Sequence, residues 1–231
     1  MIKVSGLTCS YGNLQVFHDL NFEIEKGDYL VIVGENGSGK STLLKTILGL
    51  KKPDSGHITM EDFKDIGYVP QENNAAKNFP ALVKEVIMSG IISRNKFFYN
   101  KNDYQKLQEV STLLELDKIL NKSISELSGG QKKRVMLARA LVRGADILFL
   151  DEPTSSLDPL RTSDFYSTLD KLNADGRTIV TVSHDLRSII NCAKTVLHLG
   201  ANDQGVLFFG AKEDYMKSEL FKVLSGVHIH E

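Results

Sequence analysis

One short stretch of this chain restricts its possible folds more than any other. The apolar run YLVIV, from Tyr29 to Val33, leads directly into GENGSGKS at 34–41. The second stretch fits G-x-x-x-x-G-K-[ST], in which glycines let the backbone wrap closely around phosphate and turn its N–H groups inward. A helix is predicted over 40–49, and its N-terminus adds partial positive charge at the same place. The sequence therefore predicts a strand buried on both faces that ends in a phosphate-binding loop.

The loop pattern assigns roles to particular side chains. Lys40 can reach the β- and γ-phosphates of a nucleotide, and the hydroxyl of Ser41 can ligate Mg²⁺. The glycines at 34, 37 and 39 do not fit the dinucleotide-binding pattern G-x-G-x-x-G. The residues expected to line the nucleotide are Gly34, Glu35, Asn36, Gly37, Ser38, Gly39, Lys40, Ser41 and Thr42.

A second apolar strand, predicted over 147–150, ends in Asp151 and Glu152. A phosphate-binding loop needs a metal-binding acid at the end of a neighbouring strand, and Asp151 is placed to hold Mg²⁺. Glu152 is placed to polarise an attacking water as a general base. We therefore expect nucleotide hydrolysis where these two strands end.

The order of the predicted elements indicates an α/β fold. Apolar strands at 29–33, 147–150 and 178–182 alternate with helical stretches, which is typical of a parallel sheet with helices on both faces. At the N-terminus, 2–4 and 22–25 alternate apolar with polar residues, which predicts half-exposed antiparallel strands. The other elements expected in the core are helices at 40–49, 159–173, 185–192 and 211–224, and a return of strand character at 194–209.

The middle third of the chain differs, because apolar residues recur there at helical spacing without a convincing strand between them. The helical stretches lie at 83–92, 101–120 and 130–143. We therefore expect a single domain, 1–231, whose core is 1–72 and 144–231 and whose inserted helical subdomain is 73–143.

Composition narrows the class of protein. The chain has 231 residues, and 28 Lys and Arg against 29 Asp and Glu argue against a general nucleic-acid binder, which needs a cationic surplus. No apolar run approaches the roughly 20 residues that span a bilayer, and the first residues lack the apolar core of a signal peptide. Two cysteines, Cys9 and Cys192, cannot form a disulfide framework, so we expect a reduced, cytoplasmic protein.

A second glycine-containing helix start, LSGGQ, occupies residues 127–131 and precedes a long predicted helix. It is a second potential anion site, because a helix N-terminus presents unpaired N–H groups. It begins 87 residues after Lys40 and within the helical insert. From the residues alone it need not share the phosphates bound at the first site.

The phosphate loop, LSGGQ and the strand ending in Asp151 and Glu152, in that order, resemble the nucleotide-binding subunit of ABC transporters over essentially the whole chain. The resemblance implies ATP and Mg²⁺ as cofactors. It also implies a head-to-tail dimer in which LSGGQ of one subunit binds the γ-phosphate held by Lys40 of the other. The residues carried over in this second site are Ser128, Gly129, Gly130 and Gln131.

The resemblance extends to further positions. Tyr11 matches the aromatic residue that stacks on adenine, and Gln71 matches the glutamine that touches Mg²⁺ and the attacking water and senses the membrane partner. His184 matches the switch histidine that contacts the γ-phosphate. Asp158 matches an acid that positions the neighbouring subunit's loop. The resemblance thus implies three catalytic residues, Glu152, Gln71 and His184. It implies three ligands of Mg²⁺, namely Ser41, Gln71 and Asp151.

As a transporter subunit without a membrane span, the chain would lie peripherally on the cytoplasmic face of the membrane. Its partners would be multispanning permease subunits, a second ATPase subunit (a homodimer by expectation) and, indirectly, an extracytoplasmic solute-binding protein. The segments 79–90 and 97–99 are similar to the corresponding stretch in importers of zinc, manganese or iron.

Two alternatives stay open. The chain could be a non-transport ABC ATPase that acts in assembly or repair, although the repair type would need a long coiled-coil insert. The C-terminal His228 and His230 could ligate Zn²⁺, or the tail could be an unordered terminus. The cargo itself is not readable from the residues.

Overall fold

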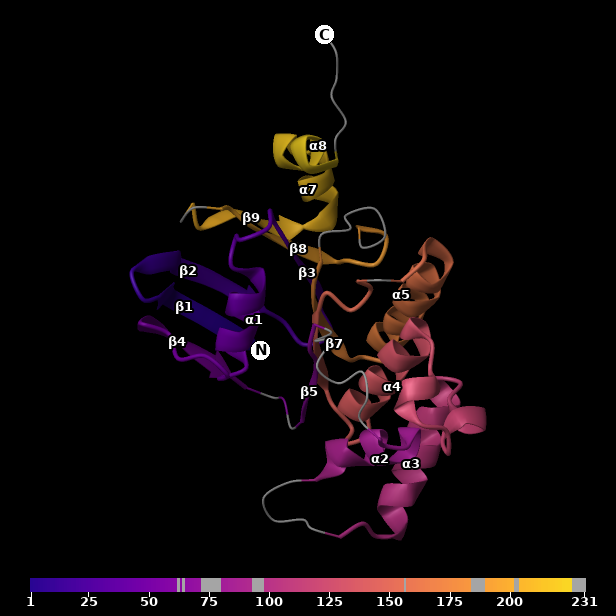
Figure 1. Cartoon of the computed structure of the whole chain (residues 1–231). Helices are drawn as coiled ribbons and strands as arrows, with labels where there is room; N and C mark the ends of the chain where they lie inside the picture. The colour runs from indigo at the N-terminus through magenta and orange to yellow at the C-terminus, as the bar shows by residue number, and fades with distance from the viewer. Residues whose placement is uncertain are drawn as a thin grey trace.

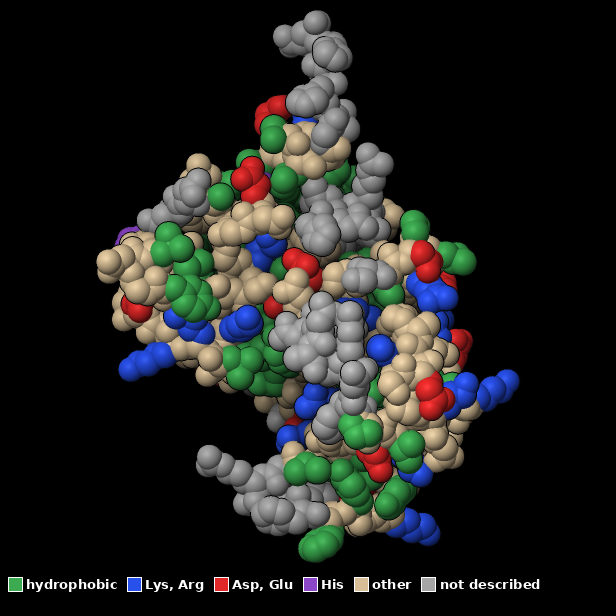
Figure 2. Space-filling model, viewed as in Figure 1, with side chains coloured by type: hydrophobic (Ala, Val, Ile, Leu, Met, Phe, Trp, Pro, Cys, Tyr) green, Lys and Arg blue, Asp and Glu red, His purple; other side chains and the backbone are tan. Residues whose placement is uncertain are grey.

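The computed structural model describes residues 1–61, 63, 65–71, 80–92, 98–155, 157–183, 190–201 and 204–225. An N-terminal sheet packs on one face of a larger central sheet, and a group of helices packs on the other face (Figure 1). On the face that Figure 2 shows, cationic and anionic side chains are mixed, in keeping with the near-zero net charge. No helix among the described residues is long and apolar enough to cross a membrane.

The N-terminal sheet is antiparallel, as the alternation of its residues predicts. It consists of β1 (Ile2–Tyr11), β2 (Leu14–Ile24) and β4 (Ser55–Met60) in the order β2-β1-β4. The buried side chains of β1 and β2 form a core with α1 (Lys40–Ile47) and one face of the central sheet. No β4 strand was predicted, because its side chains are mostly exposed and only Ile58 and Met60 alternate with polar residues.

The central sheet has the order β5-β6-β7-β3-β8-β9. Its strands are β3 (Tyr29–Val33), β5 (Ile66–Val69), β6 (Ile147–Asp151), β7 (Thr178–Val182), β8 (Thr195–Leu199) and β9 (Val206–Ala211). The first five are parallel and β9 is antiparallel. Every residue of β3, β6 and β7 is buried, which confirms the buried strands predicted over 29–33, 147–150 and 178–182.

Helices cover the second face of this sheet. They include α5 (Pro159–Ala174) and the helices between β5 and β6, namely α2 (Val83–Met88), α3 (Lys101–Leu113) and α4 (Gly129–Leu141). The predicted helix 101–120 was too long, because Glu115 adopts a φ of +59° and ends the regular helix. A 3₁₀-helix over Asp117–Ile119 follows it.

A close contact between helices within this region gives a stability prediction. Gly90 lies in a 3₁₀-helix, Ser89–Ile91, and a Cβ atom there would clash with the carbonyl oxygen of Arg139 on α4 and lie 2.9 Å from Cγ1 of Val142. We expect Gly90→Ala to lower the free energy of unfolding in urea by about 1–3 kcal/mol. Gly210→Ala is the control, because its Cβ atom would meet nothing closer than 3.4 Å. Equal stability of the two variants would contradict the packing argument.

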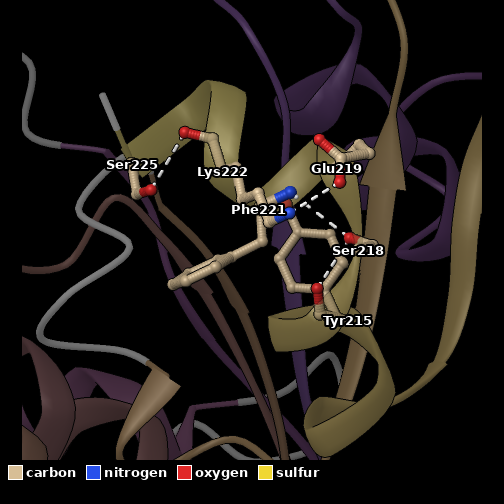
Figure 3. Close-up of polar contacts among 6 residues, drawn as sticks. All are labelled: Tyr215, Ser218, Glu219, Phe221, Lys222 and Ser225. Atoms are coloured by element: carbon tan, nitrogen blue, oxygen red, sulfur yellow. Dashed lines mark hydrogen bonds and ion pairs between the residues drawn. The ribbon is translucent and has the colours of Figure 1, made fainter. Parts of the chain in front are cut away.

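The C-terminal helix predicted over 211–224 is two helices, α7 (Lys212–Lys217) and α8 (Glu219–Ser225), because Ser218 is extended at φ −75°, ψ 153°. Ser218 Oγ donates to the carbonyl of Tyr215 at 2.6 Å and accepts from Phe221 N at 3.3 Å, which fixes the corner (Figure 3). The fully buried Tyr215 anchors α7, since its hydroxyl lies 3.1 Å from Nδ1 of His198 on β8.

Candidate nucleotide site

The loop between β3 and α1 has the shape of an anion-binding turn, and its glycines are required by contact and by conformation. Gly34 has a φ of +145°, and a Cβ atom there would clash with the carbonyl of Leu199 and lie 2.7 Å from Ser38 Oγ. Gly39 caps α1 with a φ of +89°. A Cβ atom at Gly39 would lie 3.2 Å from Phe17 of β2, so the loop is wedged against the N-terminal sheet.

The ammonium of Lys40 lies inside the curve of this loop. It is 6% exposed, and Nζ donates to the carbonyls of Gly34 at 2.9 Å and Glu35 at 2.7 Å. Burial lowers the pKa of Lys40, and the nearby carboxylates of Glu152 and Asp151 partly offset that effect. Within the described residues, the buried Ser38 Oγ has no hydrogen-bond partner. A cation and an unsatisfied hydroxyl inside one loop suit a phosphate group.

The first turn of α1 meets the end of β6. Ser41 Oγ donates to Asp151 Oδ1 at 2.7 Å, although the two residues are 110 positions apart. Burial raises the pKa of Asp151, and the hydrogen bond from Ser41 opposes this. A hydroxyl and a carboxylate in contact beside the phosphate loop are the hard oxygen donors that Mg²⁺ takes, so the residues present fit that ion.

Glu152 and Gln71 also come together. Gln71 follows β5, and its Nε2 donates to Glu152 Oε2 at 2.9 Å. Glu152 holds a φ of +48°, in the left-handed region that non-glycine residues seldom occupy, while its N–H donates to Val182 O at 3.0 Å. The sequence placed both residues in the site, and the structure joins them directly.

Tyr11 is the last residue of β1, and it is 53% exposed. Nζ of Lys51 lies 4.1 Å from the centroid of this ring and donates to Ser10 O at 2.8 Å. No motif links Lys51 to Tyr11, so this contact could not be predicted from the sequence. A cation against one face leaves the other face of the ring for stacking.

The LSGGQ segment forms the start of α4. Ser128 caps the helix by accepting from Gln131 N at 3.3 Å, and Ser128 N donates to Gln131 Oε1 at 3.0 Å. Gly129 and Gly130 face the beginning of α5, where a Cβ atom on Gly130 would lie 3.3 Å from Arg161. The segment thus belongs to a different neighbourhood from Lys40. His184, His228 and His230 lie outside the described residues.

The site thus contains the phosphate loop and two hydrogen-bonded pairs, Ser41 with Asp151 and Gln71 with Glu152. A family model described as ABC transporter matches residues 17–155. The chain belongs to the ABC transporter family. Similar proteins within that ABC family include the zinc uptake system ATP-binding protein ZurA of Listeria innocua. It is 36% identical over 227 residues, covering 93% of this chain and 87% of the relative.

Two further ABC proteins support the assignment. The manganese transport system ATP-binding protein MntB of Bacillus subtilis is 36% identical over 195 residues, covering 81% of this chain and 78% of the relative. A solved dimeric cassette of a bacterial ABC transporter is 28% identical with a TM-score of 0.78, covering 92% of this chain and 99% of the cassette.

These matches confirm the predicted family and the α/β cassette fold with its antiparallel N-terminal sheet. The chain is therefore the ATP-binding, ATP-hydrolysing subunit of an ABC transporter. The division into core and helical subdomain and the roles of individual residues stay predictions.

Proposed function

We propose that this chain powers the uptake of zinc or manganese, with hydrolysis carried out by Glu152 and its neighbours. The observation that carries the cargo class is the near-full-length similarity to ATP-binding proteins named for zinc and manganese uptake. The hydrolytic roles rest on the two contacts at the strand ends, Ser41 with Asp151 and Gln71 with Glu152.

In this proposal ATP enters with its phosphates in the loop. Lys40 exchanges the two loop carbonyls it now holds for phosphate oxygens. Backbone N–H groups of the loop bind the remaining phosphate oxygens. Ser41, Asp151 and Gln71 would hold Mg²⁺, which supplies charge neutralisation on the β- and γ-phosphates. The exposed face of Tyr11 stacks on adenine.

Glu152 then acts as the general base. Its carboxylate accepts a proton from the attacking water. The Gln71 amide, which already donates to that carboxylate, orients the carboxylate and the water. His184 would contact the γ-phosphate. Gln71 is also the route by which a membrane partner would influence hydrolysis, since its position follows β5 and precedes the helices 83–141.

A second subunit completes the site in this proposal. Ser128, Gly129, Gly130 and Gln131 form a helix start remote from Lys40 of the same chain, which suits a head-to-tail homodimer in which they bind the partner's γ-phosphate. The dimer would sit at the cytoplasmic face of the membrane, bound to permease subunits that receive metal from an extracytoplasmic binding protein.

The test is reconstitution. The chain is co-expressed with ABC permease subunits of its source organism, and the complex is purified through a tag on the permease. ATP-dependent uptake of Zn²⁺, Mn²⁺ and Ca²⁺ into proteoliposomes is then measured. We expect co-purification and uptake of Zn²⁺ or Mn²⁺ but not Ca²⁺. An ATPase that binds no permease would favour the assembly or repair alternative, and uptake of none of the three ions would overturn the proposed cargo.

The adenine contact has its own prediction. Tyr11→Ala should weaken ATP binding about fivefold to 100-fold, because stacking a base on an aromatic ring contributes about 1–3 kcal/mol. Tyr11→Phe keeps the ring and should bind ATP with nearly unchanged affinity. Titration calorimetry with ATP compares the two variants. Wild-type affinity in Tyr11→Ala would place adenine elsewhere.

A further inference from the structure

The segment that follows Glu152 is fastened to α5 by a side-chain hydrogen bond. Thr154 Oγ1 lies 3.1 Å from the hydroxyl of Tyr166, and the bond is partly buried. Tyr166 itself is 2% exposed and belongs to the main hydrophobic core. Neither residue belongs to the motifs that identify the nucleotide site.

The backbone of Glu152 needs such support. A non-glycine residue at a φ of +48° has a strained backbone, which persists only where its surroundings hold it. The N-terminal side is held by the bond from Glu152 N to Val182 O. On the C-terminal side, Ser155 donates to the carbonyl of Glu152 from its backbone N at 3.2 Å and from Oγ at 2.9 Å. Ser155 is the direct neighbour of Thr154.

The α5 helix is a firm support for this bond. At its far end, Asn173 Nδ2 lies 3.1 Å from the carbonyls of Gly27 and Asp28 and 2.7 Å from that of Arg177, which ties the helix to the start of β3. Between the two ends, Leu169 and Leu172 are fully or almost fully buried. The hydroxyl of Tyr166 is thus held in place by its helix, and the turn that carries Glu152 is hydrogen-bonded to it through Thr154.

We propose that Tyr166 is a positioning residue for ATP hydrolysis: through Thr154 it holds the turn after β6 so that the Glu152 carboxylate faces the attacking water. This inference rests on the proposed role of Glu152 as the base. It makes α5 part of the hydrolytic apparatus, although no residue of that helix touches the nucleotide in the mechanism given above.

The test is a double-mutant cycle with Tyr166→Phe and Thr154→Val, followed by steady-state ATPase kinetics. Each single change removes one hydroxyl from the bond, so kcat should fall about threefold to tenfold while KM for ATP stays unchanged. The double variant should be no slower than the slower single variant. Thr154→Ser keeps the hydroxyl and should retain the wild-type kcat.

A matched control is Tyr29→Phe, since Tyr29 is a fully buried tyrosine on β3 whose hydroxyl has no hydrogen-bond partner within the described residues. It should leave kcat unchanged. Unchanged kcat in Tyr166→Phe, or additive losses in the double variant, would overturn the positioning role. So would a fall in thermal stability with no change in kcat.

Combining Tyr166→Phe with Glu152→Gln tests this inference separately from the proposed role of Glu152 as the base. In Glu152→Gln, adding Tyr166→Phe should not reduce the residual hydrolysis rate further, because the position of the carboxylate no longer matters. A further loss in that background would overturn the inference while leaving the base assignment intact. Wild-type hydrolysis in Glu152→Gln alone would instead overturn the base assignment, and the inference with it.

Discussion

Glu152→Gln should reduce the steady-state rate of ATP hydrolysis by about 100-fold or more, since a general base contributes roughly 10²–10⁴ to the rate. The amide cannot take the proton of the attacking water, but it has nearly the size of the carboxylate it replaces. It can also hold the strained turn through the same backbone bonds to Val182 and Ser155. ATP binding should therefore persist, and an ATP-bound dimer should accumulate because it cannot hydrolyse its nucleotide.

Three measurements test this variant. Phosphate release gives the hydrolysis rate, titration with ATP gives the affinity, and light scattering with ATP present gives the mass of the dimer. Glu25→Gln is the matched control, because Glu25 is exposed and stands in the turn before β3, at the opposite end of that strand from the phosphate loop. It should behave as the wild type in all three. A Glu152→Gln protein that hydrolyses ATP at the wild-type rate would refute the role of Glu152 as base.

Lys40→Ala should weaken ATP binding by about 100-fold or more, because charge-assisted hydrogen bonds to two phosphates contribute about 1.5–3 kcal/mol each and water recovers a small part of the loss. The ammonium of Lys40 is buried and donates to the carbonyls of Gly34 and Glu35. Lys40→Ala leaves these two carbonyls without that donor, so its folding stability is measured beside its ATP affinity.

Titration calorimetry with ATP and urea unfolding measure the two effects separately. Lys26→Ala, an exposed lysine in the turn before β3, is the control for loss of positive charge. It should keep ATP affinity within about twofold, because exposed charges beyond a Debye length are screened. Normal ATP affinity in Lys40→Ala would contradict the assignment of the loop.

The parts of the site that lie next to each other in the sequence were predictable. The β3 strand, the glycine loop and α1 form one continuous segment, and the buried strand that ends in Asp151 and Glu152 forms another. Their chemistry follows from residue type and spacing, so Lys40, Ser41 and Asp151 could be assigned before the fold was known. Parallel strands bring their carboxyl ends to one edge, which explains why the two segments meet.

Contacts between distant segments were not predictable in the same way. The four-residue β5 has no alternation long enough to identify, yet it delivers Gln71 to Glu152. Lys51 reaches Tyr11, and Tyr166 reaches Thr154, through packing that no local pattern encodes. The end of α3 at Leu113 depends on the backbone of Glu115, whose residue type gives no signal for a left-handed conformation.

The strand order has a consequence for how the protein is made. The β3 strand is hydrogen-bonded on one side to β7 and on the other to β8, so Leu30 pairs with Val180 and with Thr195. The segment that carries the phosphate loop leaves the ribosome before its neighbours in the sheet, which follow roughly 150 residues later. Until then both edges of an apolar strand are open to pairing with other chains. Synthesis of β7 and β8 thus closes the two open edges of β3.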